Sequence, residues 1–393
     1  MDKFTLIEDK FGLIDKQLIS SKQIKISSNC GISKLNSIAK TAILTVLAGY
    51  WEKEKITVLD NINLKKIINI DNFVNLNLNF KGKAPRYFNA NITYQKLPNV
   101  TKKHTSILTD KNSFVGYDNI LLLSGGIDSV AGLLYLLSRN RKVLPLWIDF
   151  GQKNRVSEKK TINLIKRKLN IWVLIIKIDL KKYVYSGWSR WKQGIIPSRN
   201  FLFVALASLL ISQDKTKIWL CASKGEINSK HNDKSLLFYQ TISKMLSKYT
   251  KKKIRVWTPF YKYNKAEIIY YWKNFWGSKY KIYPQNATTC YLGNNCGLCS
   301  ACYYRFINML TANTKDIQYK NNPFFDKGRI IANYYLPNFK KWGKIRKLDF
   351  LIALSKNKND LTPETKVFFQ KHYKIYYNEI KKRIKLIKKV KIN

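Results

Sequence analysis

The ten residues Ile120–Ser129 read ILLLSGGIDS and carry the strongest structural signal in the sequence. The first four are apolar and match the length of a strand buried in a parallel sheet. Ser124, Gly125 and Gly126 are typical of a tight turn, and a leucine-rich helix is predicted to begin around Asp128. Such a turn binds anions well, because its backbone N–H groups point outward and the helix dipole favours negative charge. We therefore expect a phosphate-binding loop.

An ordinary glycine-rich corner between a strand and a helix is the alternative interpretation. The stretch is not a Walker loop, since it lacks the long spacer and the Gly-Lys-Ser/Thr ending. Asp128 and the serines on either side of the glycines favour the nucleotide-binding interpretation, and Asp128 is also a candidate catalytic residue. The predicted ligands in this loop are Ser124, Gly125, Gly126, Ile127, Asp128 and Ser129.

The chain has 393 residues, of which 45% are hydrophobic, and this length is sufficient for two or three folded domains. No apolar run approaches the ~20 residues of a membrane span. The first twenty residues contain both acidic and basic side chains, unlike a secretory signal. These features predict a soluble cytoplasmic protein without a membrane segment.

The formal net charge is +48, from 72 lysine and arginine residues against 24 acidic residues. Such a charge can indicate a nucleic-acid-binding surface. However, only 12 of the basic residues are arginine, and the lysines are spread along the whole chain. Nucleic-acid surfaces favour clustered arginine. The composition therefore favours an AT-rich coding sequence as the source of the charge, with a polyanion-binding face as the alternative.

Six cysteines occur, and four of them fall within thirteen residues. In a chain without an export signal, this grouping favours metal binding over disulfides. Four thiolates fill the coordination sphere of a tetrahedral Zn²⁺ ion and leave no open position, which predicts a structural zinc site. An iron–sulfur cluster is the alternative. The predicted ligands are Cys290, Cys296, Cys299 and Cys302.

Three regions are predicted along the chain. Residues 1–117 form an accessory domain of α+β or mostly β structure, with a helix at 33–47 and strands at 56–59, 74–80 and 92–94. Residues 118–313 form the central domain. Residues 314–393 form a basic helical extension, with helices at 338–354 and 367–392, that is either a solvated or docking element or a polyanion-binding tail.

The central region alternates short apolar runs with helical patterns, which predicts right-handed βαβ units and a parallel sheet with helices on both faces. The predicted strands are 120–123, 143–150, 172–178 and 218–222. The predicted helices are 157–169, 201–211, 235–249, 265–275 and 300–310. Ligands of such α/β sheets bind at the carboxyl ends of the strands.

Two further pairs of residues lie where a strand ends or a helix begins. Asp149 and Gln152 follow the second strand of the sheet, and a carboxylate there suits a ribose hydroxyl or a magnesium ion, although Asp is also common in turns. Arg199 and Asn200 precede a buried helix, where an arginine can neutralise phosphate in a two-point contact. All four are predicted nucleotide-binding residues.

Lys265 begins another predicted helix and is a candidate phosphate ligand. Glu267 is expected to pair with it along the helix. Lys265 and Arg199 therefore join Asp128 as candidate catalytic residues.

Taken in chain order, these motifs resemble the QueC family, the 7-cyano-7-deazaguanine synthases, within the PP-loop ATP-pyrophosphatase superfamily. The resemblance covers about residues 119 to 312. It is carried by the loop at Ser124, the Asp-Phe-Gly-Gln segment at Asp149, the Pro-Ser-Arg-Asn segment ending at Asn200, the Thr-Pro and Lys-Ala-Glu-Ile segments around Lys265, and the cysteine motif through Arg305.

The resemblance implies a PP-loop fold and an ATP-dependent C–N ligase of queuosine biosynthesis. That family uses ATP and ammonia to turn a deazaguanine carboxylate into an amide and then a nitrile. The carboxylate is adenylated first, and the pyrophosphate would be held by the amides of Gly125 and Gly126. Lys265, Arg199 and Mg²⁺ would supply positive charge to the phosphates. The implied ligands are ATP, Mg²⁺, Zn²⁺, 7-carboxy-7-deazaguanine and ammonia, and a homodimer is left open.

The chain departs from the family pattern in several places, including a shorter first cysteine spacing, and the departure in the substrate segment leaves the acceptor open. Asn154 stands where the family has a histidine, and residues 228–233 (NSKHND) lack the cysteine of the family's substrate segment. The regions outside the resemblance make the chain similar to the longer QueC-like proteins of antiphage defence, the QatC type, which implies a partner protein as acceptor. A tRNA-modifying PP-loop enzyme is a third hypothesis. An inactive nucleotide-binding module is the fourth.

Overall fold

The structure, a computed structural model, describes residues 116–178, 199–228, 233–293, 295–325 and 329–392. It also describes the backbone of five short strands between residues 2 and 95, together with residues 38, 39 and 42. The described residues fall into two compact units. The first unit lies within 1–124, 139–152 and 172–259, and the second within 125–138, 153–171 and 260–393. The predicted boundaries at 117/118 and 313/314 stay predictions.

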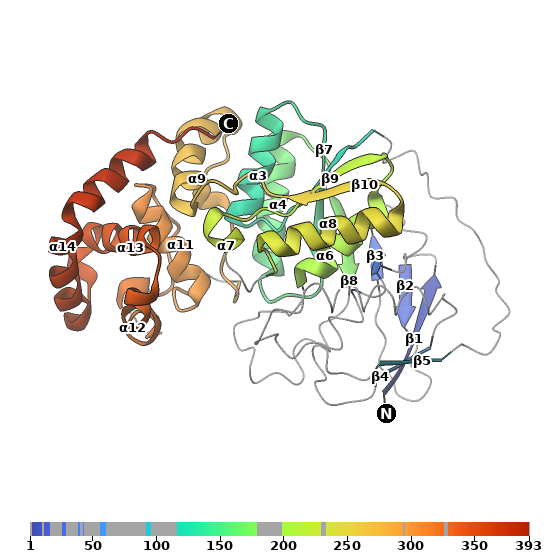
Figure 1. Cartoon of the computed structure of the whole chain (residues 1–393), viewed down its shortest axis with the longest axis horizontal. Helices are drawn as coiled ribbons and strands as arrows, with labels where there is room; N and C mark the ends of the chain where they lie inside the picture. Colours follow the sequence, from blue (N-terminus) through green and yellow to red (C-terminus); the bar gives the residue numbers. More distant parts are fainter. Residues whose placement is uncertain are drawn as a thin grey trace. The chain divides into compact units, whose positions relative to one another are not determined.

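A six-stranded sheet forms the core of the first unit, in the order β10-β9-β6-β7-β8-β3 (Figure 1). Five strands are parallel, and β3 runs antiparallel to β8. The bounds are β3 (Ile26–Ser28), β6 (Asn119–Leu122), β7 (Val143–Asp149), β8 (Leu174–Ile178), β9 (Lys215–Trp219) and β10 (Lys253–Trp257). The predicted α/β class with a parallel sheet is confirmed.

The strand order reverses at β6. From β6 the chain adds β7 and β8 on one side, and it then returns to add β9 and β10 on the other side. Ligands of doubly wound sheets bind outside the carboxyl ends of the strands at such a reversal. Leu123 continues beside β7, since its N–H donates to the carbonyl of Leu146 (2.8 Å), and Ser124 follows at once. The predicted phosphate loop therefore begins at the switch point of the sheet.

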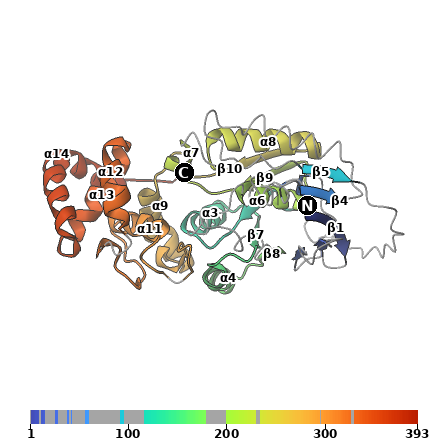
Figure 2. The ribbon, with the colours of Figure 1, turned by 90° about the horizontal axis from the view of Figure 1, so that it is seen from below.

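Two helices of the first unit, α6 (Arg199–Ala207) and α8 (Leu236–Thr250), share the hydrophobic core of the sheet. Figures 1 and 2 show α8 running alongside β10. Ser243 and Ser247 of α8 accept hydrogen bonds from the N–H groups of Val256 (2.8 Å) and Ile254 (3.0 Å). The helix therefore provides hydrogen-bond acceptors for two backbone N–H groups of β10, which is an edge strand of the sheet. The short α7 (Lys224–Ile227) follows β9.

Strand β10 was not predicted from the sequence. Its residues KIRVW alternate exposed and buried positions, and only two of the five are fully buried. Such an edge strand lacks the continuous apolar run of the central strands. The predicted strand at 218–222 was also displaced, because β9 begins at Lys215 and ends at Trp219.

A second sheet of four strands lies in the first unit, in the order β2-β1-β4-β5. Its strands are β1 (Asp2–Asp9), β2 (Gly12–Asp15), β4 (Ile56–Leu59) and β5 (Ile92–Gln95). The last two confirm the strands predicted at 56–59 and 92–94. Of the predicted helix at 33–47, only Ile38, Ala39 and Ala42 are described, and all three are buried. The strand predicted at 74–80 lies outside the described residues.

The described part of the second unit is helical. Its α-helices are α3 (Ile127–Ser138), α4 (Arg155–Leu169), α9 (Lys265–Tyr271), α10 (Gly277–Tyr280), α11 (Ser300–Thr311), α12 (Leu336–Asn338), α13 (Lys344–Lys356) and α14 (Pro363–Lys388). Helices α11, α13 and α14 lie side by side and enclose a core that includes Tyr303, Phe350 and Phe369 (Figure 2). Helix α14 confirms the helix predicted at 367–392, although it begins at Pro363 and ends at Lys388.

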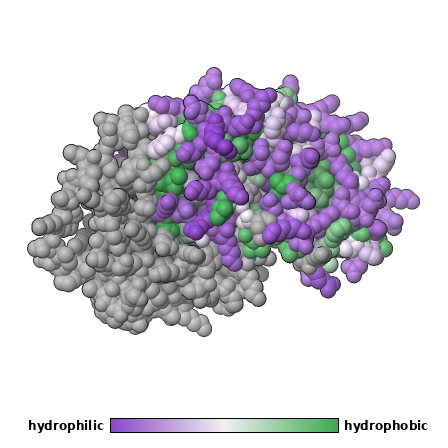
Figure 3. Space-filling view, turned by 180° about the vertical axis from the view of Figure 1, so that it is seen from behind, coloured by the Kyte–Doolittle hydropathy of each residue, from purple (hydrophilic) through white to green (hydrophobic). Residues whose placement is uncertain are grey.

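The predicted helix at 338–354 is interrupted, because Trp342 and Gly343 have extended backbones with ψ near 150° (149° and 152°). No described helix is both long and apolar enough to cross a membrane. On the face shown in Figure 3, hydrophilic residues dominate the described surface and hydrophobic ones form small separate patches.

Candidate functional site

The loop after β6 requires glycine at its second position. Gly125 has φ of +73°, a conformation that side chains with a Cβ rarely adopt. A Cβ at this position would also lie 3.2 Å from Cβ of Thr161. Helix α3 then begins at Ile127, and the hydroxyl of Ser129 donates to the carbonyl of Gly126 (3.0 Å). The loop therefore leads directly into a helix N-terminus, whose backbone donors and dipole favour anions.

Asp128 and Lys265 form an ion pair beside this loop. The ammonium Nζ of Lys265 lies 2.8 Å from Oδ2 of Asp128, and their side chains are only 9% and 12% exposed. The same ammonium lies 5.1 Å from the ring centroid of Tyr304, a cation–π contact. Helices α3, α9 and α11 therefore bring a carboxylate, a cation and an aromatic ring together. The structure joins two of the three predicted catalytic residues.

The sequence around Lys265 explains where its helix begins. Asn264 is the N-cap of α9, and its N–H donates to Oε2 of Glu267 (2.9 Å), as in a capping box. We expected Glu267 to pair with Lys265, but Glu267 instead accepts a hydrogen bond from Arg383. Residues two apart on a helix do not face each other, which accounts for the difference.

Asp149 and Gln152 lie at the end of β7 in the first unit. Oδ1 of Asp149 accepts from the N–H of Gly151 (3.0 Å), and Oε1 of the buried Gln152 accepts from the N–H of Phe150 (3.0 Å). Both side chains therefore stabilise the turn that follows the strand. Their predicted contacts with a nucleotide stay predictions.

Arg199 and Asn200 form the first turn of α6, also in the first unit. Arg199 is half-buried, and Asn200 is buried with its amide donating to the carbonyl of Asp233 (3.4 Å). Their predicted roles as phosphate and nucleotide ligands stay predictions.

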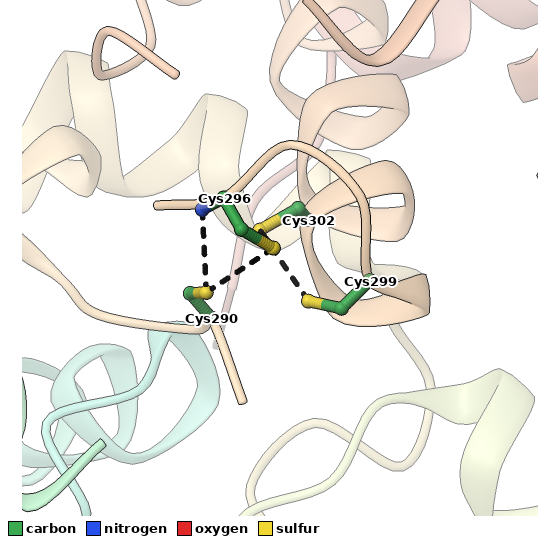
Figure 4. A group of neighbouring side chains, drawn as sticks. All are labelled: Cys290, Cys296, Cys299 and Cys302. Carbon is green, nitrogen blue, oxygen red and sulfur yellow. Dashed lines mark hydrogen bonds between the residues drawn. The ribbon is translucent and has the colours of Figure 1, made fainter. Parts of the chain in front are cut away.

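The four predicted metal ligands are brought together in the second unit (Figure 4). All four cysteines are buried, and their sulfur atoms lie within 4.8 Å of one another. The Sγ–Sγ distances are 3.7 Å for Cys290–Cys296, 3.9 Å for Cys296–Cys302 and 3.5 Å for Cys299–Cys302. A tetrahedral site with Zn–S bonds of about 2.3 Å has S···S distances of about 3.8 Å. The thiol set therefore fits one tetrahedral metal ion.

A four-iron cluster fits this geometry less well, because its irons and sulfides would hold the thiolates farther apart. The pKa of Cys299 is raised to about 11 by its hydrogen bond with Cys290 and by burial, an effect that its contact with Cys302 opposes. The pKa of Cys302 is raised by its hydrogen bonds with Cys290 and Cys299 and by burial. Binding of a cation by these thiols must therefore displace protons.

The turn between the second and third cysteines accepts only glycine. Gly297 has φ of +71°, and a Cβ there would lie 1.7 Å from the carbonyl oxygen of Asn321. The amide of Asn321 in turn donates to the carbonyl of Cys296 (2.9 Å). Backbone packing thus supports the shape of the thiol site.

Residues 284–289 connect the thiol site with the glycine loop at Gly125. The N–H of Thr288 donates to the carbonyl of Gly125 (2.8 Å), and Cys290 follows two residues later. The guanidinium of Arg305 donates to the carbonyl of Ala287 and to the hydroxyl of Thr289 (3.2 Å). It also pairs with Asp316 at 2.8 Å, with both side chains at most 6% exposed. One buried arginine therefore fixes the segment on which Gly125 rests.

The model of the family described as queuosine biosynthesis protein QueC matches residues 118–311. The chain carries a QueC domain. The match includes the glycine loop, Lys265 and the four cysteines, and it ends before α12, α13 and α14. The resemblance inferred from the motifs is thereby confirmed.

Several characterised proteins are similar to the QueC domain of this chain. The 7-cyano-7-deazaguanine synthase of Ruthia magnifica is 28% identical over 220 residues, which cover 50% of this chain and 93% of that protein. The synthase of Thermoplasma volcanium is 25% identical over 228 residues, 52% and 92% of the two chains. That of Acetivibrio thermocellus is 27% identical over 212 residues, 47% and 90%. About half of this chain therefore lies outside these matches.

Sequence reasoning missed three residues that contact the QueC loop and its lysine. Tyr304 lies beside the ammonium of Lys265, Thr288 donates to Gly125, and Thr161 packs against the same glycine. None of the three belongs to a local motif that would have singled it out. Their contacts with Gly125 and Lys265 become visible only in the folded structure.

Proposed function

We propose that the QueC domain is an ATP-dependent enzyme that adenylates a carboxylate, that of 7-carboxy-7-deazaguanine, and transfers the acyl group to ammonia. The single observation that carries this proposal is the Asp128–Lys265 pair beside a glycine loop at a helix N-terminus, within a domain of this family. The pair puts a buried cation next to donors that suit pyrophosphate.

The proposed chemistry begins with a carboxylate, which is a poor electrophile. A carboxylate oxygen attacks the α-phosphorus of ATP, and the bond to the β-phosphate breaks with its electron pair leaving on pyrophosphate. The backbone N–H groups of Gly125 and Gly126 and the ammonium of Lys265 stabilise the charge that develops there. Arg199 is proposed as a further phosphate ligand. Asp128 holds Lys265 charged and oriented.

Ammonia then attacks the acyl carbon, loses a proton and expels AMP, which leaves an amide. A second ATP adenylates the amide oxygen, and loss of AMP with the remaining nitrogen protons gives the nitrile. The domain needs no nucleophilic side chain for these steps, because positioning and charge stabilisation lower the barriers. Mg²⁺ prefers oxygen ligands such as the Asp128 carboxylate and, when bound, would neutralise the triphosphate.

We propose zinc as the ion of the four cysteines, with a structural role. Four thiolates leave no coordination position for a substrate. The ion would fix the segment from Cys290 to Cys302 and, through Thr288, the carbonyl of Gly125.

The test combines purified zinc-loaded protein with ATP, Mg²⁺, ammonium and 7-carboxy-7-deazaguanine whose carboxylate carries ¹⁸O. Mass spectrometry should find the amide or nitrile together with AMP that has gained one ¹⁸O atom, because adenylation transfers a carboxylate oxygen to phosphorus. The Asp128→Ala variant should form neither product. A wild-type protein that leaves the deazaguanine unchanged would refute this acceptor.

A protein acceptor is the second candidate. It is favoured by the departure of residues 228–233 from the family's substrate segment and by the half of the chain outside the family match. In that case the same adenylate would react with an amine of a partner protein, as in QatC-type defence systems. Intact-mass spectrometry of proteins encoded beside this gene, incubated with the enzyme, ATP and the deazaguanine, should then show an ATP-dependent mass increase. An unchanged mass of every such protein would exclude it.

A further inference from the structure

The C-terminal segment contacts the start of α9 at two points, at Glu267 in its first turn and at Tyr263 just before its N-cap. Nη1 of Arg383, on α14, donates to Oε1 of Glu267. The hydroxyl of Tyr263 donates to the carbonyl of Lys391 (2.9 Å), just beyond the end of α14. In the chain, Tyr263 lies two residues before Lys265, and Glu267 lies two residues after it. Their C-terminal partners, Arg383 and Lys391, both lie outside the QueC match.

Arg383 is itself fixed by a second carboxylate. Its Nε and Nη2 donate to the two oxygens of Asp349 on α13, at 2.8 and 3.2 Å. Arg383 and Asp349 are only 2% and 6% exposed. A two-point contact between a guanidinium and a carboxylate fixes the plane of the arginine. The remaining nitrogen, Nη1, is thereby directed at Glu267.

Glu267 joins this ion pair to the phosphate site. One of its oxygens accepts the N–H of the N-cap Asn264 and the other accepts from Arg383, so it is held from both sides. The position of Glu267 fixes the first turn of α9, in which Lys265 is the first residue. Arg383 also neutralises a half-buried carboxylate two residues from the ammonium that binds Asp128.

We propose that Arg383 is a positioning residue for Lys265, and that the C-terminal helices thereby complete the phosphate site of the QueC domain. The proposal rests on the proposed function to the extent that Lys265 binds phosphate. Arg383 does not touch the phosphate site itself. It acts through Glu267 and the capped first turn of α9.

The test variant is Asp349→Leu combined with Arg383→Met. Replacing a buried ion pair by apolar residues of similar volume is often neutral or stabilising, whereas removing one partner strands a charge. The double variant should therefore keep its fold, and any fall in its melting temperature would come from Glu267, whose half-buried carboxylate loses the guanidinium. Lys344→Met is the matched control, because it breaks another ion pair between α13 and α14, Lys344–Glu379 (2.6 Å).

We expect kcat/KM for ATP, measured by pyrophosphate release, to fall about ten- to hundred-fold in the double variant, since a misplacement of about 1 Å can cost about 10²-fold. The control should keep the wild-type value. Adding Glu267→Gln to the double variant should restore part of the rate, because glutamine still accepts from the N-cap N–H and carries no charge. A purely structural role would restore the rate only as far as it restores the melting temperature, so a larger gain in rate indicates positioning.

Two readouts do not depend on turnover. Hydrogen exchange of the amides in the first turn of α9 should be faster in the double variant, and its affinity for inorganic pyrophosphate should be about tenfold weaker. If the wild-type protein releases no pyrophosphate from ATP, the proposed function fails while these two measurements still test Arg383. Wild-type exchange and wild-type pyrophosphate affinity in a folded double variant would overturn the proposal.

Discussion

The ammonium of Lys265 lies 2.8 Å from a carboxylate oxygen of Asp128, although 137 residues separate the two in the chain. Asp128 is in the first turn of α3, and Lys265 is the first residue of α9. Their contact places a buried cation beside a helix N-terminus that follows a glycine turn. A loop that could be an ordinary corner by its sequence thus acquires the charge that a phosphate site needs.

Replacing Lys265 by methionine should lower kcat/KM for ATP by about 10²- to 10³-fold, the usual effect of removing one charge-stabilising donor. The aliphatic part of the side chain is kept, whereas the ammonium and its cation–π contact with Tyr304 are removed. The assay is pyrophosphate release. Lys262→Met, an exposed lysine in the preceding turn, is the control and should retain wild-type activity. Equal rates in the two variants would exclude Lys265 as a phosphate ligand.

Gly125→Ala should destabilise the protein and abolish pyrophosphate binding. The left-handed backbone conformation costs an L-residue about 1–2 kcal/mol, and the new methyl would press on Thr161. Calorimetry and denaturant unfolding measure both effects. Gly225→Ala is the matched control, because a Cβ there meets no atom within 4 Å and alanine favours helix α7. Unchanged unfolding and binding in Gly125→Ala would contradict the geometry of the loop.

The purified protein should contain one zinc ion per chain by elemental analysis. Cys299→Ser should lose most of this zinc, and the melting temperature should fall with it, since the free energy of metal binding contributes to folding. The buried Cys221, which lies outside the four-cysteine group, provides the control variant Cys221→Ser, with full zinc content expected. Iron and inorganic sulfide instead of zinc would identify a cluster.

Zinc affinity should weaken as the pH is lowered from about 8 to about 6, because binding must displace the thiol protons. The pKa of Cys299 in the metal-free fold is raised from 9.0 to about 11. A raised pKa stabilises the metal-free fold below pH 9.0, and this contribution is lost as the pH rises through about 11. Competition with a chromophoric chelator measures the first effect, and unfolding of the metal-free protein measures the second. A pH-independent affinity would contradict protonated thiols.

Arg305→Met should lower the free energy of unfolding by about 3–5 kcal/mol, since it strands the buried Asp316 charge and the carbonyls of Pro284, Gln285 and Ala287. Lys344→Met removes an ion pair whose lysine is 64% exposed, and it should change the same quantity by less than about 1 kcal/mol. Urea unfolding measures both. Equal effects would mean that Arg305 does not hold the segment beneath Gly125.

Local patterns were sufficient for most of the elements and for the grouping of the four cysteines. The buried run before Ser124 and the cysteine spacing each involve residues close in the chain. The short edge strand β10 escaped detection, because its alternating residues carry little apolar signal. The expected pairing of Glu267 with Lys265 was replaced by one with Arg383, 116 residues away.

The amino-acid sequence alone therefore established the parallel α/β class, the glycine loop, the four thiols and the family, because each depends on the spacing of neighbouring residues. The partner of Lys265, the support of Gly125 by Thr288 and the contact between Arg383 and Glu267 emerged from the folded chain. Such contacts join helices that are distant in sequence, and no local periodicity encodes which of many lysines or arginines will meet a given carboxylate. The packing of helices α3, α9, α11, α13 and α14 determines which of these side chains come into contact.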